Sequence, residues 1–267
     1  MLRVTVLGCG GSAGVPLIGG PDGFGDWGAC DPKEPRNRRT RASIVVESGD
    51  RRLLVDTSPD LRAQLLNCGV PRVDAILYTH PHADHIAGLD DVRILNRTGG
   101  RPLDAFGTAE TLAELARRFD YAFRPWQPPS FLRPVLAPKV VAPDDCAPMA
   151  GMPVALFPQD HGFSATLGLR IGPFAYSTDV VALSPEVLDR LRGVHTWLVD
   201  CFQREPHSTH AHLGLICEWV ARVAPRRTVL THMGADMDWA WMEANLPPGI
   251  EPAYDGQVLE VPEREFT

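Results

Sequence analysis

The feature that most constrains this chain is a cluster of histidines directly after a short apolar run. Residues 73–78 have the character of a buried β-strand, and the sequence then reads THPHADH over residues 79–85. Loops at strand ends often carry catalytic and binding side chains, because the strand holds them in place. The chain is therefore expected to build a functional site at the end of this strand.

The cluster supplies ligands of the kind that two neighbouring metal ions need. His80 and His82 can project toward one point, whereas Asp84 and His85 can face a second point a few ångströms away. Imidazole and carboxylate donors of this mixed kind suit zinc, manganese or iron. We therefore predict two divalent metal ions, zinc or manganese, with iron also compatible.

Two metal ions need more ligands than this loop contains. The remaining chain offers three candidates that each follow an apolar, strand-like segment, as the cluster does: His161, Asp179 and His232. We predict that the fold brings these strand ends to the same place.

Strand-like and helix-like segments alternate in two similar halves, which predicts an α/β fold with two sheets between layers of helices, a four-layer αββα sandwich. The predicted strands cover residues 3–7, 42–47, 52–56, 73–78, 154–157, 167–171, 174–177, 196–200 and 228–231. The predicted helices cover residues 59–67, 89–95, 109–119, 185–192, 212–223 and 237–244.

The length of 267 residues allows two small domains or one large one, and the layered pattern favours a single domain over residues 1–267. Two stretches depart from the alternation. Residues 19–41 form a loop rich in glycine, proline, aspartate and arginine, and residues 121–153 are a proline-rich insertion or lid. Its aromatic residues Trp126 and Phe131 are expected to pin it to the body of the protein.

Charge and hydropathy exclude several classes of partner. The net charge of −7 argues against a broad electrostatic grip on extended nucleic acid. No apolar run approaches the ~18 residues that cross a membrane, so we expect no membrane partner and a cytoplasmic protein, with a homodimer as one compatible assembly. The cysteines are scattered without a CxxC pair, which excludes a cysteine zinc module.

The order of four motifs along the chain resembles the metallo-β-lactamase superfamily. These motifs are a THxHxDH loop, a lone downstream histidine, an aspartate after a strand and a final strand-end histidine. The resemblance implies that His80, His82 and His161 hold one metal ion and that Asp84, His85 and His232 hold the other. It further implies that Asp179 bridges the two ions, and that Asp56 orients a ligand without binding a metal. Asp84 followed by His85 is the hydrolytic form of this loop.

The flanking motifs resemble the PhnP family of phosphodiesterases within this superfamily. They read LGCGGSAGVP over residues 7–16, RAS over residues 41–43, PHSTH over residues 206–210 and PAYDG over residues 252–256. The resemblance implies a metal-dependent phosphoric diester hydrolase that acts on phosphoribosyl 1,2-cyclic phosphate or a cyclic nucleotide-like substrate.

In such an enzyme a hydroxide that bridges the metal ions attacks phosphorus. We expect His210, which matches an additional active-site histidine of the family, to contact the substrate and donate a proton to it. Asp84 is the second residue that we assign to catalysis. Among the arginines of the early loop, Arg41 is the best candidate to bind the phosphate of a small anionic substrate, and the others can equally form a solvated surface.

One departure from the family concerns the early loop. Known members carry cysteines there that hold a separate structural zinc, whereas this chain has only Cys30, and Ala235 stands where a partner histidine is expected. We therefore expect no third metal ion, and we expect other contacts to hold residues 19–41.

Three other functions stay open at the level of sequence. The same metal ligands serve tRNA 3′-processing nucleases and thioester hydrolases of the glyoxalase II kind, and residues 57–62 resemble proteins of pyrroloquinoline-quinone biosynthesis with a binding role. The fingerprint G-x-G-x-x-A at residues 8–13 follows a strand, but Pro16 and a long loop replace the helix of a dinucleotide-binding unit. We therefore predict a tight glycine turn beside the metal site and no nucleotide cofactor.

Overall fold

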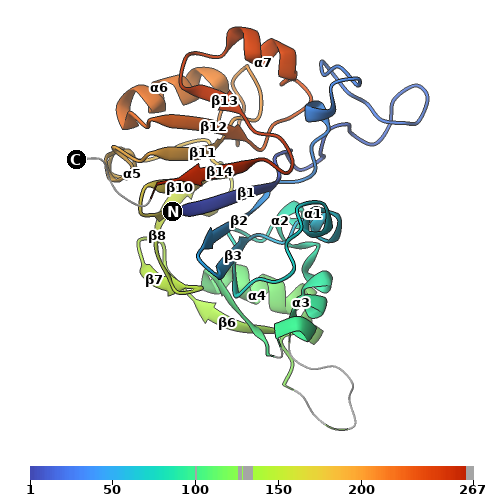
Figure 1. Ribbon diagram of the computed structural model, residues 1–267, viewed down its shortest axis with the longest axis vertical. Coiled ribbons are helices and arrows are strands. Elements are labelled where there is room, and N and C mark those ends of the chain that lie inside the picture. The colour runs from blue at the N-terminus through green and yellow to red at the C-terminus, as the bar shows by residue number, and fades with distance from the viewer. Residues whose placement is uncertain (100, 126–127, 129–134, 263–267) are drawn as a thin grey trace.

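The computed structural model describes residues 1–99, 101–125, 128 and 135–262, and it contains two seven-stranded sheets. The strand order is β14-β1-β2-β3-β4-β5-β6 in one sheet and β13-β12-β11-β10-β9-β8-β7 in the other. Helices cover the outer faces, α1, α3 and α4 on the first sheet and α5, α6 and α7 on the second (Figure 1). The predicted αββα sandwich is thus confirmed.

The strands of the first sheet are β1 Leu2–Gly8, β2 Ser43–Ser48, β3 Arg51–Val55, β4 Ala75–Leu77, β5 Leu103–Gly107, β6 Leu136–Val140 and β14 Val258–Val261. Those of the second are β7 Cys146–Met149, β8 Met152–Asp160, β9 Ala165–Ile171, β10 Phe174–Ser177, β11 Thr196–Asp200, β12 Arg227–Thr231 and β13 Ile250–Pro252. In the first sheet β3, β4 and β5 run parallel to one another, and in the second sheet β10, β11 and β12 do so.

The helices are α1 Leu61–Asn67, α2 Ala83–Ile86, α3 Val92–Gly99, α4 Ala109–Arg118, α5 Pro185–Arg190, α6 Leu213–Val223 and α7 Trp239–Asn245. Short 3₁₀ turns occur at Pro35–Asn37, Leu89–Asp91 and Asp120–Ala122. Among the described residues, none of the helices has the length and apolar character needed to span a membrane.

The core has two parts because each central strand is buried on both faces. In β2, Ile44 and Val46 join the apolar cluster between the two sheets, whereas Val45 faces the cluster under the helices of the first sheet. In β4, Leu77 and Ile76 divide in the same way. Strands covered on both sides read as continuous apolar runs, which is why these segments could be recognised in the sequence.

The prediction for residues 121–153 is wrong in part. Instead of an irregular insertion or lid, this stretch contributes β6 and β7, the outermost strands of the two sheets. Both contain a proline, Pro138 and Pro148, and proline is tolerated at a sheet edge, where its missing N–H breaks no ladder. The expected anchors Trp126 and Phe131 lie outside the described residues.

Candidate metal centre and active site

The residues predicted to bind metal converge where strands of both sheets end. Two of them, Asp179 (φ 53°) and His232 (φ 55°), stand directly after or close to a strand with a left-handed backbone, and so does the predicted orienting residue Asp56 (φ 63°). This conformation is unfavourable for residues other than glycine and typically persists where a function requires it. The backbone strain therefore marks the same strand ends that the sequence pattern selected.

The THPHADH loop leaves β4 and turns into the short helix α2. Its histidines lie side by side, with the ring centroids of His80 and His85 4.3 Å apart and those of His80 and His82 4.5 Å apart. His80 and His85 are fully buried, whereas His82 is exposed. The loop thus opens to solvent on the side of His82.

Asp56 holds this loop in place through hydrogen bonds and does not face its metal-binding side. Its carboxylate accepts hydrogen bonds from the amide of Thr79 (2.8 Å), from the Thr79 hydroxyl (2.8 Å) and from Nδ1 of His85 (2.7 Å). Because the Thr79 hydroxyl donates to Asp56, it can accept from Nδ1 of His80, 3.0 Å away. Both histidines are therefore held in the tautomer that leaves Nε2 free for a metal ion.

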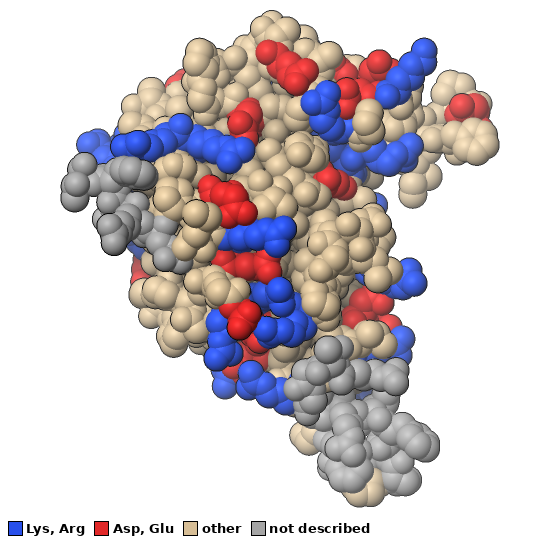
Figure 2. Space-filling model, in the orientation of Figure 1, with Lys and Arg blue, Asp and Glu red and all other residues tan. Residues whose placement is uncertain are grey.

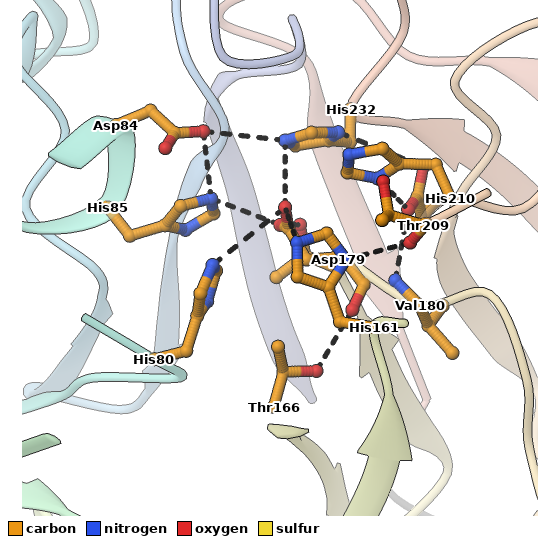
Figure 3. Close-up of polar contacts among 12 residues, drawn as sticks. His80, Asp84, His85, His161, Thr166, Asp179, Val180, Thr209, His210 and His232 are labelled. Atoms are coloured by element: carbon orange, nitrogen blue, oxygen red, sulfur yellow. Dashed lines mark hydrogen bonds and ion pairs between the residues drawn. The ribbon is translucent and has the colours of Figure 1, made fainter. Parts of the chain in front are cut away.

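Asp179 is the centre of the arrangement (Figure 3). Its Oδ1 lies 3.3 Å from His232 Nε2, 3.8 Å from His161 Nε2 and 3.9 Å from His80 Nε2, and its Oδ2 lies 3.0 Å from His85 Nε2. A carboxylate placed between four imidazoles can share its oxygens between two cations. The family resemblance implies a bridging role for Asp179, and its position between the imidazoles is compatible with that role.

The side chains divide into two groups whose ligand atoms lie within 4.8 Å of one another. The groups are His80, His82 and His161, and Asp84, His85, Asp179 and His232. Nε2 of His80, His85 and His232 is buried, and in place of a well-formed hydrogen bond it has the Asp179 carboxylate oxygens at 3.9, 3.0 and 3.3 Å. A native protein seldom leaves so many buried nitrogens unsatisfied in one place, so the donor set fits divalent cations.

Burial and neighbouring charges set the protonation of these groups. Burial lowers the pKa of His80 well below its usual value, which favours the neutral imidazole that binds metal. Burial also opposes the charged form of His232, but the carboxylates of Asp179, Asp84 and Asp200 outweigh it and raise the pKa to about 9. Without a cation, the proton on His232 balances the carboxylate charge.

His210 lies against the metal centre but is held by a different partner. Its Nδ1 is 2.9 Å from Oδ2 of Asp200, and its ring stacks on His232 with centroids 4.7 Å apart. A ring nitrogen of His210 lies within 4.8 Å of the ligand atoms of His161 and Asp179. His210 is thus in reach of a group bound at the centre, with one nitrogen already used.

Asp200 is the site residue that sequence reasoning missed. It ends β11, is fully buried, and accepts hydrogen bonds from His210 Nδ1 and from the amide of Val180 (3.1 Å). Its Oδ1 lies 3.8 Å from Nδ1 of His232. Its place at the end of a buried strand could have indicated Asp200 in the sequence, because the same pattern indicated Asp179.

The glycine turn lies beside the metal centre, as predicted. A side-chain carbon at Gly11 would lie 2.8 Å from the Phe202 ring, which leaves room only for glycine, and 3.5 Å from the His232 ring, which places the turn next to this ligand. On the other side of the turn, Arg41 forms an ion pair with Asp60 and lines a pocket together with Asp84.

The early loop, residues 19–41, is held by a buried arginine, and we expected contacts of this kind in place of a third metal ion. The Arg39 side chain is 1% exposed and donates to the carbonyls of Gly234 (3.2 Å) and Met237 and to Oδ1 of Asn37 (3.1 Å). Cys30 lies beside it, with Sγ 4.0 Å from Nη1. Among the described residues, Cys30 belongs to no group of three metal-ligand side chains.

Comparisons with known proteins agree with this architecture. The family described as "Beta-lactamase superfamily domain" matches residues 51–233. A solved diphosphatase from the PhnP family is 33% identical with a TM-score of 0.87, and the match covers 97% of this chain and 96% of that one.

Two curated relatives differ in how much of them is matched. An octanoyltransferase from Porphyromonas gingivalis is 30% identical over 259 residues, which is 96% of this chain and 51% of the relative. This chain therefore spans about half the length of that protein. A ribonuclease Z from Clostridium kluyveri is 35% identical over 103 residues, which is 38% of this chain and 27% of that protein.

The superfamily match covers more than half of the chain, and the likeness to the diphosphatase extends over nearly all of it in sequence and structure. The chain therefore belongs to the metallo-β-lactamase superfamily of metal-dependent hydrolases and, within it, to the PhnP family.

Proposed function

We propose that this protein is a dinuclear metal-dependent phosphodiesterase that hydrolyses a small anionic phosphodiester, such as phosphoribosyl 1,2-cyclic phosphate or a cyclic nucleotide-like compound. The observation that carries the proposal is the combination of two ligand groups joined by Asp179 with the His210–Asp200 pair beside them. Membership of the PhnP family and the likeness to a diphosphatase support phosphorus as the reacting centre.

His80, His82 and His161 would hold one cation, and Asp84, His85 and His232 the other, with Asp179 shared between them. Zinc and manganese suit these donors best, and iron is compatible with them. Two such cations supply a water of lowered pKa and neutralise charge on the phosphoryl oxygens. Asp84 would contribute to catalysis as one of these metal ligands.

His210 supplies the proton that hydrolysis requires. The reaction forms a P–O bond from water and breaks the P–O bond to the leaving group, whose oxygen must gain a proton. Asp200 accepts the hydrogen on Nδ1 of His210, so Nε2 is the nitrogen that can donate to the leaving oxygen. Asp200 also orients the ring.

The other candidate functions have less support. The local likeness to ribonuclease Z favours RNA, but the net charge is −7, and basic and acidic side chains alternate over the face in Figure 2. The match to the octanoyltransferase does not support a transferase activity for this chain, since about half of that protein lies outside the match. A panel of a cyclic phosphodiester, an aryl phosphodiester, a thioester and a precursor tRNA separates the alternatives, and we expect turnover of the phosphodiesters alone.

The decisive test of the mechanism replaces His210 with alanine and compares turnover of an aryl phosphodiester at equal metal content. Loss of a positioned acid is expected to lower kcat by roughly 10²- to 10⁴-fold. His195→Ala is the matched control, because His195 lies just before β11, at the end of this strand opposite Asp200, and its ring contacts Thr196. An unchanged kcat in His210→Ala would remove His210 from the mechanism.

A further inference from the structure

The imidazole of His210, the proposed proton donor, is packed among other rings. Its centroid lies 4.7 Å from that of His232 and 4.8 Å from that of His161, both proposed metal ligands (Figure 3). Two rings without a proposed metal role lie next to it, Phe202 at 5.0 Å and His207 at 5.3 Å. Because His210 is only 9% exposed, these neighbours decide how its ring can lie.

A single hydrogen bond does not fix the plane of this ring. The bond between Nδ1 and Asp200 (2.9 Å) sets the position of one ring atom, but the χ2 torsion of a histidine has only a broad preference. Rotation of the ring would swing Nε2, the nitrogen that donates. A flat neighbour can prevent this rotation, and the Phe202 ring lies at 29° to the His210 ring.

Phe202 is itself held in place by its backbone and by its ring. Its amide donates to the carbonyl of Ala211 (3.0 Å), and its carbonyl accepts from the amide of Gly234 (2.8 Å). Its ring also contacts those of His207 (5.1 Å) and His232 (6.2 Å). Phe202 is therefore the apolar side chain that the histidines on this side of the metal centre share.

Two glycines leave room for the Phe202 ring. A side-chain carbon would lie 2.8 Å from the ring at Gly11 and 3.2 Å from it at Gly234. A ring bounded this closely has little freedom to turn away from His210. The glycine turn thus contributes to the site by seating Phe202.

From this packing we propose that Phe202 is a positioning residue that sets the ring plane of His210, so that Nε2 points at the leaving oxygen. The inference rests on the proposed function and deepens it. Water forms the new P–O bond, the P–O bond to the leaving group breaks, and the proton passes from Nε2 of His210 to the leaving oxygen. An acid held in this way favours phosphodiesters with basic leaving groups, such as a sugar hydroxyl.

The kinetic test compares the phenyl and p-nitrophenyl esters of thymidine 5′-monophosphate at equal metal content. Phenoxide is the more basic leaving group and depends more on the proton from His210. Phe202→Leu keeps an apolar side chain but removes the flat face. We expect kcat for the phenyl ester to fall about tenfold or more and kcat for the p-nitrophenyl ester to fall by about twofold at most.

Gly11→Ala is the second variant, because it keeps Phe202 and His210 but places a carbon where the Phe202 ring lies. It should cause the same selective loss with the phenyl ester. Phe119→Leu is the matched control, since Phe119 is also partly buried but packs in the core under the helices of the first sheet. A ratio of the two kcat values that stays within about twofold of the unmodified ratio in Phe202→Leu or Gly11→Ala would overturn the positioning role.

A measurement without turnover separates this inference from the proposed function. Hydrogen exchange of the Nδ1–H group of His210, followed by NMR in the zinc-loaded protein, should be about tenfold faster or more in Phe202→Leu and unchanged in Phe119→Leu. If the unmodified protein hydrolyses neither ester, the proposed function is refuted, and faster exchange in Phe202→Leu still supports the positioning role. Turnover of both esters with unchanged exchange in Phe202→Leu would refute the positioning role alone.

Discussion

At the scale of single residues, the site is built from pairs in which one side chain fixes the tautomer of another. Asp56 and Thr79 hold His85 and His80, the carbonyl of Thr209 accepts from Nδ1 of His161 (2.7 Å), and Asp200 holds His210. Sequence order indicated the histidines, and the family resemblance implied Asp56, but Thr79, the Thr209 carbonyl and Asp200 were not anticipated as partners. Asp200 was missed because an aspartate ten positions before His210 becomes its neighbour only through the turn after β11.

Replacing Asp200 with asparagine tests the role of its charge. Asparagine keeps the size and one acceptor oxygen but replaces the carboxylate that accepts from Nδ1 of His210 with a weaker neutral acceptor, so the ring is held less firmly and kcat should fall roughly a hundredfold with metal content unchanged. Steady-state kinetics with an aryl phosphodiester measures this, and Asp50→Asn in the exposed β2–β3 turn serves as the control. A kcat within about twofold of the unmodified protein would show that the carboxylate charge is dispensable.

Metal binding should depend on pH through His232. Its pKa is raised to about 9 without a cation, so below that pH a cation must displace a proton. The carboxylates of Asp179, Asp84 and Asp56 also raise the pKa of His85 well above its ordinary value, so a second proton must leave. The affinity for zinc or manganese should therefore rise with pH by up to about tenfold per pH unit per displaced proton, and the rise should become less steep above pH 9, where His232 no longer contributes. Calorimetric titration at several pH values in two buffers of different ionisation enthalpy counts the protons. A pH-independent affinity would contradict this protonation state.

At the scale of elements, the strands covered on both faces were predictable and the edges were not. The edge strands β13 and β14 were missed, and β13 has only three residues, among them a glutamate and a proline. β5 is an exception, because it is an interior strand and was also missed; its aspartate and glycine weaken the strand pattern. β6 and β7 were hidden by prolines that only a sheet edge tolerates. The ligand-bearing loops after β4, β10 and β12, in contrast, follow buried runs, which is why the sequence pattern could indicate them, whereas β8, before His161, alternates between buried and exposed residues.

The early loop gives a second prediction at this scale. Arg39→Met keeps the bulk of the side chain but leaves the carbonyls of Gly234 and Met237 and Oδ1 of Asn37 without their donor. The free energy of unfolding should fall by about 3 kcal/mol, as expected when a buried charged donor is removed. Urea unfolding measures it, with exposed Arg38→Met as the control. Equal losses in the two variants would mean that Arg39 does not anchor the loop.

At the scale of the whole molecule, the metal centre joins the two halves of the sandwich. The loops of the first sheet carry Asp56 and the THPHADH cluster, whereas those of the second carry His161, Asp179 and His232. No single half holds a complete ligand set. The resemblance found in the sequence anticipated this division, because the order of the motifs along the chain already reflected the topology.

Removal of metal should therefore loosen the whole fold. A cation at a hundred times its dissociation constant stabilises the folded state by about 2.7 kcal/mol, which corresponds to a rise in Tm of roughly 5 to 10 °C for a chain of this size. Chelation with EDTA should lower Tm by this amount, and added zinc or manganese should restore it. An identical Tm with and without chelator would show that the centre contributes nothing to stability.

The most direct test of the central claim is to count bound metal in the purified protein by elemental analysis. For the unmodified chain we predict about two equivalents of a divalent transition metal, and for His82→Ala and Asp179→Ala at most about one. Two full equivalents in either variant would contradict the ligand assignment, and no bound metal in the unmodified chain after loading would contradict the dinuclear centre itself.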